Sequence, residues 1–135
     1  MRYLTEYSAI EWLKLLPIQH ALKQVRNDVW LAVYKNNRTS KLSQFLAENN
    51  HLANQNIALV IAFEQPWALN WLLQMATRNA SDLTVLVFDN SRNDLKRIEI
   101  EQVCKKNKAP YLALPPNPTR HVNRSHGMAM TWVYH

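Results

Sequence analysis

The chain has 135 residues, 47% of them apolar, which is enough for one folded domain with a single core and excludes a disordered tail. Its only cysteine, Cys104, excludes an internal disulfide and a Cys-rich zinc site, and its only glycine, Gly127, excludes the glycine-rich loops that hold NAD, FAD or ATP. The formal net charge of +6 favours anionic partners, which include nucleic acid, a membrane surface and small phosphorylated ligands.

No part of the sequence has the pattern of a membrane span or a targeting segment. Apolar runs stay well below the ~18 residues that cross a bilayer. The opening MRYLTEYSAIEW has acidic residues where a secretory leader carries a basic run followed by an apolar one. We therefore expect a protein with no membrane span and a cytoplasmic location.

Residues 1–54 are expected to form a mainly helical N-terminal region. Ser8 and Glu11 fit a capping box that opens one helix, and Pro17 can begin another. Residues 29–34 (VWLAVY) fit a strand as well as a helix. No Gly- or Ser-rich linker precedes residue 55, so we expect this region to pack on the rest of the chain.

Residues 55–135 show an alternation of strands and helices. Two continuous apolar runs, 57–63 and 83–88, are rich in β-branched residues and predict strands covered on both faces. A helix is expected at 66–79 and another at 93–107, and 111–114 is a shorter third strand. Because β-α-β crossovers give parallel neighbours, we predict an α/β fold: a three-layer, Rossmann-like sheet of parallel strands with flanking helices.

Polar residues follow the first two strands, where ligands of open α/β sheets bind. Asp89 can accept hydrogen bonds from a ribose hydroxyl or a base N–H, and the alternative is an Asx-type turn that closes the strand. Asn90 and Ser91 could likewise either contact a ligand or form the turn, and the position of Ser91 favours capping of the next helix. Glu64 and Gln65 could line the same cleft or simply form the strand-to-helix turn.

A basic, proline-rich loop follows the third strand. Arg124, together with Arg120 and Lys108, could grip a diphosphate. A helix opening near Ser125 would add N–H groups that favour an anion. His126 is either a ligand contact or a packed, hydrogen-bonded histidine, and its neighbourhood lacks the acidic residue that a metal site needs.

Aromatic residues recur along the helix expected at 66–79. Trp67, Trp71 and Met75 are four residues apart and predict a packed face, either in the core or at a subunit interface of a homodimer. Stacking on bases or sugars is the alternative.

The order VLVFDNS, a helix, YLALPPNP and NRSHGMAMTW resembles the nucleotide-binding half of A-type-fold glycosyltransferases, especially the inverting family-2 group. The resemblance covers about residues 57–135 and implies that the parent protein is a hexosyltransferase. Such enzymes transfer a sugar from a nucleoside-diphosphate donor to an acceptor hydroxyl, and use a divalent metal, Mg or Mn, at the diphosphate. Nucleoside-diphosphate sugar is thus the implied partner.

The resemblance also implies roles for single residues. Asp89 matches the aspartate that lies against the nucleotide base, and Phe63–Pro66 matches the loop after the first strand. Asn123, Arg124 and Gly127 match a polar stretch ahead of a helix that faces the nucleotide, although the spacing after the asparagine differs from the family's.

The metal-binding motif of that family is missing from this sequence. No Asp-x-Asp occurs, so the ligands of the expected metal are not present, and we expect the chain alone to be inactive. The last predicted helix has no stop signal before His135, which predicts that the half-domain 55–135 is truncated.

Two other functions remain open. A small basic α/β module could bind nucleic acid through residues 105–124, which contain basic residues and no acidic one. A non-catalytic interaction domain could instead dimerise through the apolar helix at 66–79.

Overall fold

The computed structural model describes residues 8–15, 17–119 and 121–135, which fall into two compact units. One unit reaches to Val33, and the other runs from Tyr34 to His135. No helix within the described ranges is long and apolar enough to cross a bilayer. The candidate site lies wholly in the second unit.

Helices α1 (Ala9–Leu15) and α2 (Pro17–Asn36) account for the N-terminal unit, and α2 continues into the second. The capping box predicted at the start of α1 is confirmed, because the Glu11 carboxylate accepts a 2.8 Å hydrogen bond from the Ser8 N–H while Ser8 Oγ accepts one from the Glu11 N–H. Residues 29–34, which fitted a strand or a helix, lie inside α2.

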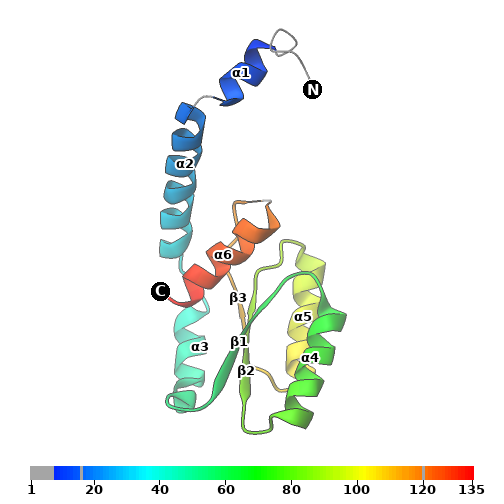
Figure 1. Cartoon of the computed structure of the whole chain (residues 1–135). Helices are drawn as coiled ribbons and strands as arrows, with labels where there is room; N and C mark the ends of the chain where they lie inside the picture. The colour runs from blue at the N-terminus through cyan, green and yellow to red at the C-terminus, as the bar shows by residue number, and fades with distance from the viewer. Residues whose placement is uncertain (1–7, 16, 120) are drawn as a thin grey trace. The chain divides into compact units, whose positions relative to one another are not determined.

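The second unit is a mixed α/β structure with a parallel sheet flanked by helices (Figure 1). Its elements are α3 (Leu42–Glu48), a short 3-10 helix η2 (Asn50–Leu52), β1 (Ile57–Ala62), α4 (Pro66–Asn79), β2 (Thr84–Asp89), α5 (Asp94–Lys106), β3 (Tyr111–Ala113) and α6 (Val122–Val133). The strand order is β1-β2-β3, and Ala62, Asp89 and Ala113 pair at one level. The predicted parallel three-stranded sheet is therefore confirmed.

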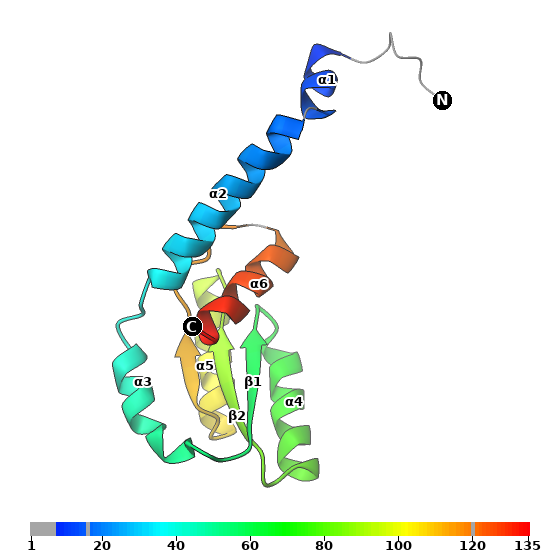
Figure 2. The same ribbon diagram turned by 60° about the vertical axis from the view of Figure 1, so that its left-hand side comes forward.

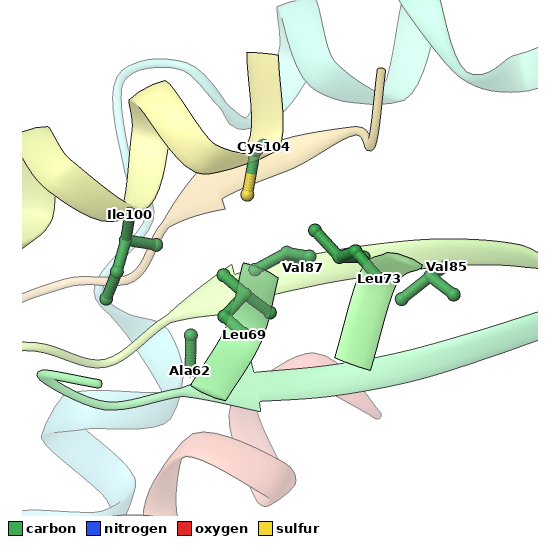
Figure 3. Packing of buried hydrophobic residues seen from close by; sticks show 7 residues of the cluster. All are labelled: Ala62, Leu69, Leu73, Val85, Val87, Ile100 and Cys104. Atoms are coloured by element: carbon green, nitrogen blue, oxygen red, sulfur yellow. The ribbon is translucent and has the colours of Figure 1, made fainter. Parts of the chain in front are cut away.

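Helices α4 and α5 cover one face of the sheet and form the main core with it (Figure 3). Side chains alternate between the two faces of a strand, so Val85 and Val87 point to this core while Phe88 points away. The buried members of the core are Ala62, Leu69, Leu73, Val85, Val87, Ile100 and Cys104. Burial of each large member contributes about 1.5–3 kcal/mol before the entropy cost of ordering it.

Helices α3 and α6 lie against the opposite face, as the two views of Figures 1 and 2 agree. The ring of Phe45 on α3 meets the ring of Phe88 edge to face, with centroids 5.7 Å apart. On α6, Trp132 is only 8% exposed, and its indole N–H donates a 2.8 Å hydrogen bond to the Asn37 carbonyl. Aromatic packing therefore holds this layer to the sheet.

Two local expectations differ from the structure. Helix α5 is capped by Asn93, whose side-chain oxygen accepts from the Leu95 and Lys96 N–H groups. Ser91 is therefore not the cap of this helix, and its hydroxyl instead accepts a hydrogen bond from the Glu64 N–H. On α4, Trp67 and Trp71 are 72% and 65% exposed, so they are not in the core of this chain. Leu69 and Leu73 face the sheet instead, because they lie on the opposite side of the helix.

Candidate functional site

Polar side chains gather where β1, β2 and β3 end, at the level of Ala62, Asp89 and Ala113. Asp89, Asn90 and Ser91 are all buried there, with exposed fractions of 0%, 3% and 1%. Buried polar groups are costly unless they are hydrogen-bonded, so their partners define what this end of the sheet is built to do.

The Asp89 carboxylate is fully engaged inside the protein. Its Oδ1 accepts a 2.8 Å hydrogen bond from the Ser91 N–H, and its Oδ2 accepts a 2.9 Å hydrogen bond from the Tyr111 hydroxyl. Burial and then the nearby negative charge of Asp89 raise the pKa of Tyr111, so its hydroxyl stays protonated and keeps donating. The carboxylate thus closes an Asx-type turn, and its predicted contact with a nucleotide stays a prediction.

Glu64 connects the end of β1 to the start of α5. It has a positive φ of 51°, and its N–H donates to Ser91 Oγ at 2.9 Å. Its Oε1 accepts from the N–H groups of Arg92 and Asn93 at 3.2 and 3.3 Å, next to the N-terminus of α5, where a negative charge is favourable. Glu64 and Ser91 therefore join the two strand-to-helix turns.

Asn90 connects the end of β2 to the first turn of α6. Its side-chain amide donates to Ser125 Oγ at 2.9 Å and to the Ser125 carbonyl at 3.3 Å. Its side-chain oxygen accepts a 3.2 Å hydrogen bond from Asn117, which also donates to the Ser125 carbonyl. This network holds the start of α6 over the sheet end. The helix begins at Val122, so Ser125 lies inside its first turn and is not the residue at which it opens, as the sequence had suggested.

A hollow of about 340 Å³ opens beside this network. Its lining comes from the end of β1, the end of β2 and the first turn of α6: Phe63, Asn90, Val122, Asn123, Ser125 and His126. Four of the ten predicted site residues therefore meet around one space, namely Phe63, Asn90, Asn123 and His126.

The other predicted residues do not line this hollow. Asp89 shares a face of the sheet with Val87, toward α4 and α5, and Ser91 is buried beside it. Gln65 is exposed, and its side-chain oxygen accepts a 2.8 Å hydrogen bond from the Trp67 indole. Arg124 is half-buried on α6.

Gly127 also lies on α6, where its backbone needs no special conformation. It is exposed, and a Cβ placed there would meet no atom within 4 Å in the described structure. The described residues therefore offer no crowding that would explain a glycine at this position.

Sequence reasoning missed three residues that build this end of the sheet: Tyr111, Arg97 and Asn117. The Arg97 guanidinium donates to the Ser91 carbonyl at 2.7 Å and to the Leu114 carbonyl at 3.1 Å, so it joins the ends of β2 and β3. Asn117 lies between Pro116 and Pro118 in the basic, proline-rich loop. No local pattern signals these roles, because each partner is distant in sequence.

Neither metal ligands nor an unbroken basic surface is present in the described part of the chain. No group of three or more His, Cys, Asp or Glu residues there could hold a metal ion. Within the basic stretch, Lys105 forms a 2.8 Å ion pair with Glu101, and this hydrogen bond lowers the pKa of the Glu101 carboxyl. Part of the predicted nucleic-acid surface is therefore already paired.

Comparison with known proteins adds no relative: no protein-family model, curated protein or solved structure matches this chain significantly.

Proposed function

We propose that this chain is the nucleotide-sugar-binding portion of a glycosyltransferase that moves a sugar from a nucleoside-diphosphate donor to an acceptor hydroxyl. The observation that carries the proposal is the hollow at the carboxyl ends of β1 and β2. Ligands of parallel α/β sheets bind at this edge, and a volume of about 340 Å³ falls within the range of small-molecule sites.

The lining of the hollow suits a nucleotide in three respects. The Phe63 ring supplies an apolar surface on which a base can stack. Asn123 and His126 are exposed polar side chains on the same turn of α6, and they can reach the sugar or base edges. The first turn of α6 also carries N–H groups that favour a phosphate, with Arg124 as the nearest described cation in sequence. In this proposal Asp89 supports the turn beneath the ligand.

The proposal is limited to binding the donor. The divalent metal implied by the family resemblance finds no ligand set among the described residues. We propose that a longer, cytoplasmic parent hexosyltransferase supplies the metal ligands and the base, within a complete Rossmann-like three-layer fold. The chain alone then binds the nucleotide without transferring sugar.

Titration of UDP, GDP and ADP and their sugars against ¹⁵N-labelled protein tests this proposal. The expected result is saturable shifts at Phe63, Asn90 and His126 for one nucleotide. Phe63→Ala should weaken binding about tenfold, as loss of one stacking partner does, while the control Phe45→Leu, at a residue of α3 that does not line this hollow, should not. Nucleotides that leave the hollow unshifted contradict the proposal. Salt-sensitive shifts at Lys106 and Lys108 with RNA would favour the nucleic-acid module instead.

A second candidate function, self-association through α4, has its own observation. Trp67 and Trp71 are exposed, and Arg78 is the only charged residue in the fourteen of α4. We propose that this face pairs with the same face of a second copy, as a two-fold dimer requires. Sedimentation should show a dimer that Trp71→Lys dissociates. Leu95→Lys, at an exposed apolar position on α5, is the control, and a monomer at high concentration would exclude the dimer.

A further inference from the structure

A second hollow, of about 500 Å³, lies on the sheet face covered by α3 and α6. It shares no lining residue with the hollow at the strand ends. Phe45, Phe88 and Trp132 line its apolar part, and each is less than 9% exposed. Its volume falls inside the range of about 300–1,000 Å³ typical of sites for small molecules.

The apolar wall of this hollow is a fixed surface. The Phe45 and Phe88 rings meet at an interplanar angle of 63°, which is the favourable edge-to-face arrangement. Trp132 is tied by its indole N–H to the Asn37 carbonyl, in the segment that joins α2 to α3. A ligand that enters finds an apolar surface already formed and loses little free energy in ordering it.

The charged side chains in the lining have one sign. Lys35 and Arg38 line the hollow, no Asp or Glu does, and His135 is the remaining titratable residue. Arg38 is exposed and Lys35 is half-buried, so both retain contact with water. Cationic groups beside a buried aromatic surface complement a molecule that has an apolar body and one anionic head.

We propose that this hollow binds an amphiphilic anion, a medium-chain alkyl carboxylate or phosphate, with the chain against Phe45, Phe88 and Trp132. The head group is held by Lys35 and Arg38. Burial of the chain supplies most of the affinity, because apolar area removed from water is the dominant favourable term. The two cations select the charged head over a neutral one of the same length. This inference is independent of the nucleotide proposal.

Calorimetric titration of the whole chain with decanoate, decyl phosphate and decanol tests the inference. One saturable site per chain is expected for both anions, with a Kd below about 1 mM. Shifts should appear in the NMR signals of Phe45 and Trp132. Tighter binding of decanoate identifies a carboxylate site, and tighter binding of decyl phosphate identifies a phosphate site. Either result supports the proposal.

Matched variants separate the head from the chain. Arg38→Gln should raise the Kd of both anions about threefold, as loss of a solvent-exposed charge does, and leave the Kd of decanol unchanged. The control Arg78→Gln, at an exposed position in the last turn of α4, should change nothing. Leu46 lines the hollow and is 59% exposed, so the Leu46→Glu variant should still fold. Its added negative charge should weaken the binding of both anions more than Arg38→Gln does.

Three results would overturn this assignment. The first is no saturable binding of either anion up to about 1 mM. The second is equal weakening of decanol and the anions by Arg38→Gln. The third is shifts confined to Phe63 and His126, which would place the ligand in the nucleotide hollow and leave this one without an occupant.

Discussion

The Tyr111 hydroxyl donates a 2.9 Å hydrogen bond to Oδ2 of Asp89, a fully buried carboxylate on the neighbouring strand. In the register of β2 and β3, Tyr111 pairs with Val87 and Ala113 pairs with Asp89, so the tyrosine reaches along the strand to the carboxylate. Removing one partner leaves a buried charged group short of a donor, which costs more than a surface hydrogen bond.

The Tyr111→Phe variant should therefore lose stability. We expect a decrease of about 1–3 kcal/mol in the free energy of unfolding, measured by urea denaturation. Tyr134→Phe is the control because Tyr134 is 70% exposed, and it should change the midpoint little. Equal midpoints for Tyr111→Phe and the wild type would show that the Asp89 carboxylate does not depend on this donor.

Asn90→Ala should loosen the first turn of α6. The variant removes two buried hydrogen bonds to Ser125 and the acceptor of a partly buried one from Asn117, and we expect a decrease of about 1–3 kcal/mol in the free energy of unfolding. Hydrogen exchange should accelerate at the amides near Ser125 more than in α4. Asn123→Ala, on the exposed side of the same turn, is the control. Uniform acceleration across the unit would contradict a local role for Asn90.

Cys104 should resist thiol reagents in the native state. It is 0% exposed on the core-facing side of α5, and burial, followed by the negative charges of Asp89 and Glu101, raises the pKa of its thiol to about 12. Labelling with a disulfide reagent at pH 8 should be slow in buffer and fast in denaturing urea. Complete labelling of the native protein at the unfolded rate would place this thiol at the surface and contradict the core packing.

Tyr34→Phe should stabilise the protein. The Tyr34 hydroxyl is buried and has no hydrogen-bond partner among the described residues, so removing it should raise the free energy of unfolding by about 1 kcal/mol. Urea denaturation at neutral pH measures the change. Destabilisation instead would show that the hydroxyl has a partner, such as a bound water.

The same tyrosine predicts a dependence on alkaline pH. Burial raises the pKa of Tyr34 from 10.0 to about 12, against a lesser opposing effect of Arg97. A pKa raised in the folded state means that ionisation of Tyr34 is easier in the unfolded chain. The free energy of unfolding is therefore unaffected by this ionisation below pH 10 and decreases as pH rises from 10 to about 12. Stability in this window should fall less steeply for Tyr34→Phe than for the wild type. Parallel pH profiles for the two proteins would contradict the assignment.

Much of the fold was predictable because its signals are local. The apolar runs of β1 and β2, Pro66 at the start of α4 and the capping box at Ser8 each depend on residues close in sequence. The parallel direction of the three strands followed from the rule for crossovers, whereas their order, β1-β2-β3, was not predicted. The exposure of Trp67 and Trp71 in this chain could not be predicted, since helical spacing shows that residues share a face without showing what covers it.

The candidate site was predictable only in part. Sequence position placed Phe63, Asn90, Asn123 and His126 near strand ends or a helix start, and the fold brings these four to one hollow. Sequence position could not reveal the hydrogen bond from Tyr111 to Asp89, because neither segment by itself determines the register between the two strands.

The sequence by itself determined which segments become strands and helices, and that the strands run parallel, because apolar periodicity and end signals act over a few residues. Only the tertiary structure decided which face of the sheet each side chain occupies. Hydrogen bonds between residues distant in the chain, such as Asn90 to Ser125, bring the first turn of α6 to the sheet end. Pairing of this kind depends on how whole elements pack, because a buried polar group is costly unless a partner that is distant in sequence is brought to it.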